Sequence, residues 1–395
     1  MLDIIDVYKA FNPGTINEKV ALNGLNLTLN EGDFVTVIGG NGAGKSTLFN
    51  AITKKNILAA NYPFATIEPN VGIVNVPDER IEKLNQMYNP MRLIPTSYEF
   101  NDIAGLVKGA SNGEGLGNKF LSHIREVDAI VEVVRCFDDS NIIHVDSTID
   151  PIRDIDVINI ELIMSDLEII DNRINKIAKK AMTTKDKKDL AEIELLNRIK
   201  TSLESGIAVR KMELDEEELN LISSFNLITL KPIIYVCNVN ENDVSTGNEY
   251  TKKVEEFAKN EGSEVVIICA KIESELVELP EEEQLEYLNE IGISESGLSK
   301  LIKKTYSLLG LATYFTVGSD EVKAWTFKKG MKAPACAGLI HSDFERGFIR
   351  AEVISYNDLI ECGSENAVKE KGKMRLEGKE YFMQDGDICH FRFNV

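Results

Sequence analysis

The chain has 395 residues, of which 43% are hydrophobic and 27% charged, and its formal net charge is −20. This length predicts two or three domains, and the acidic balance disfavours a protein that binds DNA or RNA over its whole surface. No basic segment leads into an apolar run at the N-terminus, and no stretch of about 18 apolar residues occurs, so we expect a cytoplasmic protein without a membrane span. The six cysteines lack paired spacing and predict reduced thiols rather than a zinc site.

The first predicted element is a β-hairpin within residues 1–33. Residues 2–7 and 20–29 are strand-like, and Asn12-Pro13-Gly14 interrupts them. An apolar strand at residues 34–38 follows and runs into a match to G-x-x-x-x-G-K-[ST]. Glycines let the backbone amides surround a phosphate, a Lys adds a positive charge, and a Ser offers an oxygen to Mg²⁺. The motif therefore predicts a nucleoside triphosphate site formed by Gly39, Gly40, Asn41, Gly42, Ala43, Gly44, Lys45, Ser46 and Thr47.

Residues 1–50, including this Gly-rich loop, resemble the beginning of an ABC-transporter ATPase. In that family an aromatic residue upstream of the loop stacks on adenine, and Phe11 stands at about that position. The rest of the chain lacks an LSGGQ-like signature, which an ABC cassette contributes to its partner's ATP. The resemblance therefore covers only the first 50 residues, and a complete ABC cassette is rejected.

Two further stretches carry residues that suit Mg²⁺ and a γ-phosphate. Thr66 lies in the loop after the first helix, where GTPase-type domains place a second Mg²⁺ ligand. A strand-like run then ends in the D-x-x-G pattern of Asp102 and Gly105. The Asp can hold Mg²⁺ through water, and the glycine amide can sense the γ-phosphate. We interpret the glycine-rich residues 105–117 as a switch loop, with a passive surface loop as the alternative.

Residues 158–225 interrupt the alternation of strands and helices. Apolar residues step by three and four from Ile160 to Ala181, and a second stripe runs from Leu190 to Leu203. We predict an antiparallel helical hairpin of coiled-coil type that projects from the nucleotide domain. Its tip, residues 176–188, holds six lysines and one aspartate, so it is either a phosphate-contacting surface or an ordinary solvated tip.

The chain returns to the sheet at the strand-like residues 232–237, which are followed by Asn238-Val239-Asn240-Glu241. GTPases carry N-K-x-D at this place, and its Asp accepts from the guanine N1 and N2 protons. Here Glu241 replaces the Asp, and the Lys is missing. Because a site built for specific base hydrogen bonds rejects the wrong partner strongly, we infer adenine rather than guanine. Ala270 and Lys271, after a strand at residues 264–269, form the predicted base-side loop.

From about residue 46 to residue 395 the chain resembles the Obg-like ATPase (YchF) family. The motifs that carry the resemblance are NYPFATIEPN, DIAGLVKGAS, GEGLGNKFL, NVNE, HSDFERGFIRAEVI and GKEYFMQDGDICHFRFNV. It implies an α/β P-loop domain, an inserted helical arm and a C-terminal β-grasp TGS domain at residues 306–395. It also implies Mg²⁺-dependent ATP hydrolysis and association with ribosomes and ribosomal RNA. Basic clusters at residues 328–332 and 369–375 are candidate RNA contacts, or plain solvated surface.

The resemblance also bears on catalysis. Leu106 stands where Ras-type GTPases place a water-orienting Gln, so hydrolysis should be slow unless another residue acts. The resemblance points to His144 as that residue, since histidine titrates near neutral pH, although a His that only packs a loop is the alternative. Gly42 stands where the family carries an Asn that helps bind a monovalent cation, and Asn41 lies one residue earlier. Stimulation by K⁺ therefore stays open.

These patterns predict a hairpin at residues 1–33, a nucleotide domain at 34–157 and 226–305, an arm at 158–225 and a TGS domain at 306–395. The leading hypothesis is an ATPase. A GTPase is one alternative, and comparison of ATP and GTP affinities separates the two. A nucleotide-gated binding protein with little turnover is another. The ABC-like opening also suggests a chimera joined near the phosphate-loop helix.

Overall fold

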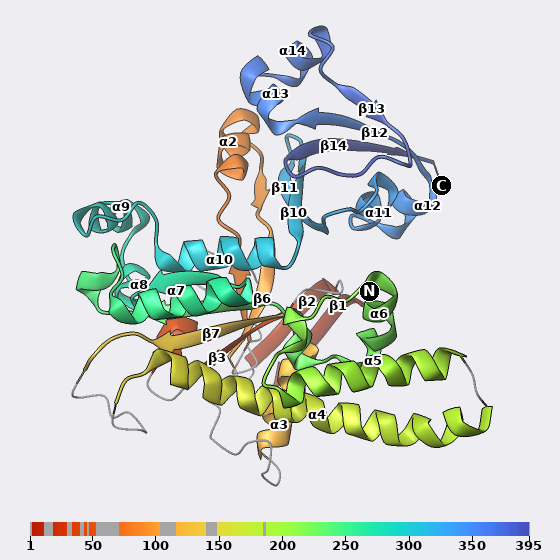
Figure 1. The fold of residues 1–395 in the computed structure, drawn as a ribbon. Helices are drawn as coiled ribbons and strands as arrows, with labels where there is room; N and C mark the ends of the chain where they lie inside the picture. Colours follow the sequence, from red (N-terminus) through yellow and green to blue (C-terminus); the bar gives the residue numbers. More distant parts are fainter. Residues whose placement is uncertain are drawn as a thin grey trace.

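A computed structural model of the chain describes residues 2–11, 19–29, 34–39, 43–45, 47–52, 71–102, 116–139, 148–184 and 187–394. Two six-stranded sheets organise these residues, one in the nucleotide domain and one in the C-terminal part (Figure 1). A separate two-stranded antiparallel sheet, β1 (Leu2–Phe11) and β2 (Lys19–Leu29), precedes them. None of the helices described is long and apolar enough to cross a membrane.

The nucleotide-domain sheet has the strand order β4-β6-β3-β7-β8-β9. Its strands are parallel except β4, which runs antiparallel to β6. Every residue of β7 and β8 is buried, as expected for central strands covered by helices on both faces. The strands are β3 (Phe34–Gly39), β4 (Val71–Asn75), β6 (Ser97–Asp102), β7 (Ala129–Arg135), β8 (Ile233–Asn238) and β9 (Glu264–Ile268).

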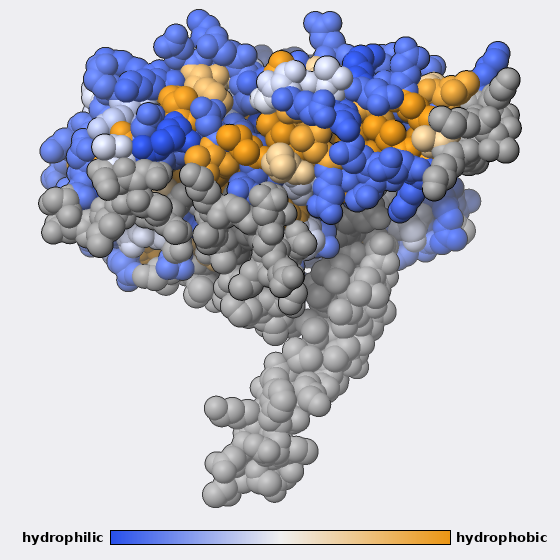
Figure 2. Space-filling view, turned by 60° about the horizontal axis from the view of Figure 1, so that its bottom comes forward, coloured by the Kyte–Doolittle hydropathy of each residue, from blue (hydrophilic) through white to orange (hydrophobic). Residues whose placement is uncertain are grey.

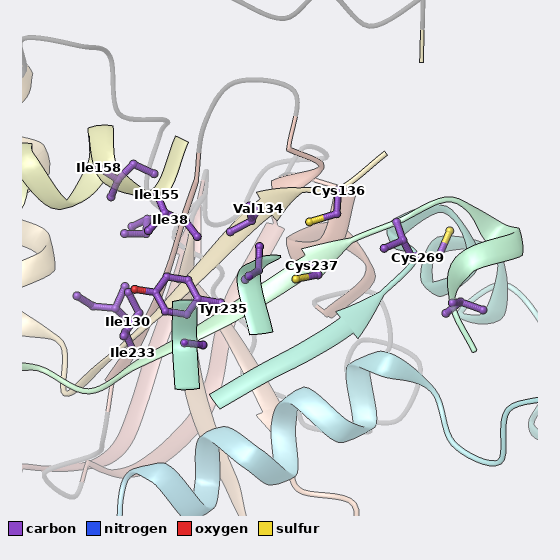
Figure 3. Close-up of a cluster of buried hydrophobic side chains, with 14 of the residues drawn as sticks. Ile38, Ile130, Val134, Cys136, Ile155, Ile158, Ile233, Tyr235, Cys237 and Cys269 are labelled. Atoms are coloured by element: carbon purple, nitrogen blue, oxygen red, sulfur yellow. The ribbon is translucent and has the colours of Figure 1, made fainter. Parts of the chain in front are cut away.

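Two hydrophobic clusters fill the space between this sheet and its helices. One cluster joins the sheet to α3 (Leu116–Glu126), α4 (Pro151–Thr184) and α7 (Glu249–Glu261), and Figure 3 shows Ile155 and Ile158 of α4 close to Ile38 of β3. The other joins the opposite face to residues 47–52 and to α10 (Gly297–Leu308). The helices α8 (Ala270–Leu276) and α9 (Glu281–Glu290) follow β9.

The helices α4 and α5 (Lys187–Glu204) lie side by side and extend beyond the sheet (Figure 1). Most of the apolar stripe meets at their contact, where Ile170, Leu196 and Ile199 are fully buried. Ile160 and Leu190 depart from the expected stripe, because they are 57% and 49% exposed. The chain then passes through α6 (Glu216–Ile222) before it reaches β8.

The second sheet has the strand order β13-β12-β14-β10-β11-β5. Its strands are β5 (Arg92–Ile94), β10 (Leu311–Val317), β11 (Glu321–Lys328), β12 (Phe348–Ser355), β13 (Arg375–Glu377) and β14 (Asp387–Phe393). One face packs on α11 (Ala333–Gly338) and α12 (Ser342–Arg346). The other packs on α2 (Glu79–Tyr88), α13 (Tyr356–Cys362) and α14 (Glu365–Glu370).

Residues 79–94, predicted as part of the nucleotide domain, contribute α2 and β5 to the C-terminal sheet and its core. The strand β5 pairs in parallel with β11 and extends the C-terminal sheet, and α2 contributes Ile81 and Leu84 to the core of that sheet. Three-residue strands carry almost no sequence signal, and Ile81 and Leu84 would lie on one helix face in either domain. The sequence alone therefore does not indicate which core this segment joins.

Asp385-Gly386 is a dipeptide typical of β-hairpin turns and lies between β13 and β14. The strand β13 pairs with β12 and not with β14, so no hairpin closes there. Gly386 has φ +85°, and the carboxylate of Asp385 accepts from the backbone N–H of Thr313 at 2.9 Å.

The surface in the view of Figure 2 is mainly hydrophilic where residues are described, with apolar patches between the polar groups.

Candidate nucleotide site

The phosphate loop begins where β3 ends at the centre of the sheet. A Cβ added at Gly39 would lie 2.4 Å from the carbonyl oxygen of Val133 on the neighbouring strand β7. Only glycine fits against that backbone, so the first glycine of the motif is required by the sheet itself. The loop consequently leaves the sheet at its carboxyl edge, where ligands bind in parallel α/β sheets.

The second glycine of the motif packs against the strand that bears the base-side motif. Gly44 has φ +90°, and a Cβ there would lie 2.2 Å from the Nδ2 atom of Asn238. That Nδ2 donates to the carbonyl oxygen of Ala43 at 2.8 Å, and the Oδ1 atom accepts from the backbone N–H of Ala270 at 2.9 Å. Asn238 is 5% exposed and joins the phosphate loop directly to the predicted base-side loop.

Lys45 begins the helix that follows the loop and is only 8% exposed. The helix is anchored by the buried side chains of Leu48 and Ile52, and the Leu48 N–H donates to the carbonyl oxygen of Gly44 at 2.9 Å. Thr47 is exposed. A left-handed glycine, a buried lysine and a helix N-terminus together form a cradle that suits a phosphate group.

The predicted Mg²⁺ ligands are described only in part. Asp102 is the last residue of β6 and lies opposite Val37 of β3, so position 102 is at the same edge of the sheet as the phosphate loop. This placement fits the role expected of a D-x-x-G aspartate. Seven predicted site residues lie outside the described part of the chain: Gly40, Asn41, Gly42, Ser46, Thr66, Gly105 and His144.

Glu241 and Lys271, predicted to face the base, form an ion pair with each other. The two side chains are 47% and 68% exposed. The carboxylate of Glu241 raises the pKa of Lys271. Val239 is different, because its side chain is 3% exposed and its N–H donates to the carbonyl oxygen of Ile268 at 2.8 Å. In the described structure Val239 therefore contributes to the core, while Glu241 and Lys271 are accessible.

Two supporting residues were missed by the sequence analysis. Asn248 caps α7 and donates to the carbonyl oxygen of Cys136 at 2.8 Å and to the carboxylate of Asp243 at 2.9 Å. Glu273 is 2% exposed and accepts from the N–H of Gly297 at 2.7 Å. Only the N-cap preference of an Asn before a helix was visible in the sequence. Asn248 therefore links the start of α7 to the end of β7, and Glu273 links α8 to the start of α10.

Comparison with known proteins gives consistent matches. A model described as a 50S ribosome-binding GTPase matches residues 34–166, and a C-terminal YchF model, described as a protein of unknown function, matches residues 311–394. The chain is 58% identical over 361 residues to the ribosome-binding ATPase YchF of Bacillus subtilis, which covers 91% of this chain and 98% of the relative. The chain belongs to the YchF family. The Haemophilus influenzae YchF protein is 53% identical over 359 residues, again covering 91% of this chain and 98% of that protein.

A solved YchF structure agrees with this assignment. The structure of the Schizosaccharomyces pombe YchF GTPase has a TM-score of 0.83 and 40% sequence identity, and the match covers 92% of this chain and 99% of that one. The predicted α/β fold with a P-loop nucleotide domain is confirmed.

The comparisons move the boundary of the resemblance toward the N-terminus. The GTPase-type match begins at residue 34, so it includes the phosphate loop that was expected to belong to an ABC-like segment. Nothing in these matches supports an ABC-type N-terminus or a chimera. The G-x-x-x-x-G-K-[ST] pattern is common to many nucleotide-binding proteins, so its presence within residues 1–50 does not separate an ABC ATPase from a GTPase-type domain.

Proposed function

We propose that this YchF family member binds and hydrolyses ATP at the phosphate loop and associates with the ribosome. The observation that carries the proposal is the position of Asn238, which bonds to both the phosphate loop and the base-side loop. Such a link lets one site recognise phosphate and base together. The relatives from Bacillus subtilis and Haemophilus influenzae are both named ribosome-binding ATPases. A protein with this role would act in the cytoplasm.

Each residue of the nucleotide site has a proposed role. Lys45 and the loop amides bind the phosphates, and Ser46, Thr66 and Asp102 would hold Mg²⁺, which when bound neutralises phosphate charge. The N–H of Gly105 contacts the γ-phosphate and sets the state of the switch loop. Because Leu106 cannot orient water, His144 takes that role and accepts the proton of the attacking water. K⁺ stimulation is not part of this proposal.

Adenine is the proposed base, with GTP as the second candidate. Glu241 would accept from the exocyclic amine of adenine, and the neighbouring Lys271 would hold the carboxylate in place, as their ion pair suggests. A carboxylate cannot donate to the O6 atom of guanine, but it can accept from the guanine N1 and N2 protons. The GTPase names of the matched family model and of the fission-yeast structure favour that second candidate.

The ribosome-facing parts are proposed to be the arm and the C-terminal domain, which we assign as a TGS domain of β-grasp type. Of the six lysines of residues 176–188, Lys176 lies on α4 and Lys187 and Lys188 lie on α5, where they can meet RNA phosphates. The basic clusters of the C-terminal domain are weaker candidates. Lys373 pairs with Asp358 and Glu361, and Arg375 pairs with Asp387, which already balances much of their charge.

Calorimetric titration with ATP and with GTP, each in the presence of Mg²⁺, tests the proposal. We expect clear preference for ATP and loss of binding of both nucleotides in the Lys45→Ala variant. Equal or guanine-favouring affinity would overturn the adenine assignment. Sedimentation with ribosomes in the presence of ATP tests the proposed association with the ribosome. Absence of the protein from the ribosome pellet would contradict that association.

A further inference from the structure

One segment of the nucleotide domain leaves its own sheet and becomes part of the C-terminal domain. We call residues 76–96 the crossover segment; it contains α2 and β5 and connects β4 to β6. The two strands pair antiparallel from Val71 opposite Asn101 to Asn75 opposite Ser97. One end of this strand pair therefore lies beside Asp102 at the nucleotide edge, and the other end leads into the crossover segment.

The crossover segment is built into the C-terminal core rather than resting on its surface. Leu93 of β5 lies opposite Val322 of β11 in a parallel pairing. Leu84 of α2 is fully buried and Ile81 is 3% exposed, within a cluster that also contains Phe315 and Ile388. In Figure 1 α2 stands beside β11, away from the nucleotide-domain sheet. Burial of this kind makes the segment move as one unit with the second sheet.

Polar contacts fix the same junction. Arg80 donates to the carboxylate of Asp385 at 2.7 Å and to that of Asp78 at 2.8 Å, and its guanidinium lies 5.3 Å from the ring centre of Phe315. The side chains of Arg80 and Asp385 are 25% and 50% exposed. At the other end of α2, the hydroxyl of Tyr88 donates to Glu365 at 2.9 Å. The contacts at both ends of α2 restrict its rotation within the C-terminal domain.

The contact between the crossover segment and the C-terminal domain leaves a cavity. A cavity of about 270 Å³ lies beside the Arg80 ion pair and is lined also by Lys303 and Tyr306 of α10. The hydroxyl of Tyr98 on β6 donates to the backbone carbonyl of Ile302 on the same helix at 2.9 Å. The strand pair is thus held by α10 near the end that leads into the crossover segment, beside this cavity.

We propose that β4, β6 and the crossover segment couple the nucleotide state to the C-terminal domain. A change at the nucleotide edge shifts the strand pair, and the crossover segment carries that shift into β11, because the segment and the second sheet share one core. The coupling is reciprocal, so a partner held by the C-terminal domain changes nucleotide affinity by the same factor. This inference rests on the proposed nucleotide binding and adds its route of regulation.

Hydrogen exchange of the full-length protein tests the coupling, in the free state, with Mg-ADP and with Mg²⁺ and a slowly hydrolysed ATP analogue. We expect exchange rates in peptides of α2, β5 and β11 to differ between the two nucleotide states by roughly five-fold or more, the lower end of typical couplings. In the Arg80→Ala and Asp385→Asn variants the difference at β11 should fall, while nucleotide still protects the phosphate-loop peptides. Asp385→Asn retains an oxygen that accepts from Thr313, so it tests the charge with little change in fold.

The Lys252→Ala variant is the matched control, because it removes an exposed ion pair with Glu249 on α7, outside the crossover segment. It should leave the exchange difference at β11 unchanged. Identical exchange of β11 in both nucleotide states, with normal protection of the phosphate loop, would overturn the coupling alone. Absence of protection at the phosphate loop itself would overturn the proposed function and, with it, this inference.

Discussion

The side-chain amide of Asn238 lies between Ala43 and Ala270, and it donates to the carbonyl oxygen of the first at 2.8 Å and accepts from the N–H of the second at 2.9 Å. Both bonds are buried. The side-chain amide supplies a donor and an acceptor on two separate atoms, one for each of these loops. The phosphate loop and the base-side loop are consequently held in one arrangement before a nucleotide arrives.

Replacement of Asn238 by alanine should damage both stability and binding. Two buried backbone groups would lose their partners, and each such loss costs about 1–3 kcal/mol of unfolding free energy. Because both loops lose their common support, we expect ATP affinity to fall by roughly ten-fold or more. Urea unfolding and calorimetric titration measure the two effects. Asn240→Ala, at an exposed neighbouring position, should change neither, and unchanged ATP affinity in Asn238→Ala would contradict the bridging role.

Gly44→Ala tests the contact of the phosphate loop with Asn238. The new Cβ would lie 2.2 Å from Nδ2 of Asn238 and would occupy a left-handed backbone conformation. We expect loss of ATP binding together with reduced thermal stability. Gly206→Ala is the control, since Gly206 has φ +76° but no atom within 4 Å of its added Cβ, and should cost only about 1–2 kcal/mol of backbone strain. Similar losses of stability in the two variants would argue that the contact with Asn238 is unimportant.

The nucleotide-domain sheet was largely predictable from the sequence. The mainly apolar sequences of β3, β7 and β8 are typical of strands that are buried on both faces. The glycine and lysine pattern located the phosphate cradle, because the positions of Gly39 and Gly44 are dictated by neighbouring backbone and side-chain atoms. The sequence was therefore sufficient to predict these strands and the phosphate loop, because their residue types follow a recognisable pattern.

Contacts between distant segments were not predictable in the same way. The docking of α2 depends on Arg80 meeting Asp385, which lies 305 residues later in the chain. The buried Glu273 looked like any helical surface glutamate, and the N–H of Gly297 that it accepts from lies 24 residues later in the chain. The ABC-like interpretation failed for a related reason, because the loop motif is shared by many families and only the whole-chain comparison separates them.

The root of the helical arm depends on Asp166, which is fully buried on α4. It accepts from the backbone N–H groups of Ile228 at 3.0 Å and Thr229 at 2.8 Å, from the Thr229 hydroxyl at 2.7 Å and from Arg125 at 2.8 Å. Asp166→Ala removes the carboxylate that pairs with Arg125 and the acceptor of the two buried amides, while Arg125 keeps its bonds to Ser165. We expect a loss of about 3–5 kcal/mol. Asp166→Asn should lose less, since one oxygen still accepts. Chemical unfolding measures both, and equal stability of all three proteins would contradict this role.

A buried carboxyl group on β7 should make stability depend on pH. Glu132 is 1% exposed, and its Oε2 atom has no hydrogen-bond partner among the described residues. Burial raises its pKa well above the usual range, and the nearby Arg210 opposes this shift while the acidic Glu261, Asp154 and Asp156 add to it. The folded protein therefore keeps a proton on Glu132 under conditions in which the unfolded chain has released it.

The sign of the pH effect follows from this proton. Between the unfolded pKa of a glutamate, near 4.5, and the raised pKa of Glu132 in the folded protein, the folded state binds more protons than the unfolded state. Unfolding free energy therefore falls as pH rises through this window, by at most about 1.4 kcal/mol per pH unit. Glu132→Gln removes the titrating group and keeps a neutral side chain of the same size. We expect the Gln variant to gain stability relative to the natural protein as pH increases from about 5 to 8, in urea unfolding at each pH. Glu282→Gln, at an exposed site on α9, is the control and should give no trend. A constant difference between Glu132→Gln and the natural protein across this range would mean that Glu132 is already ionised in the folded state.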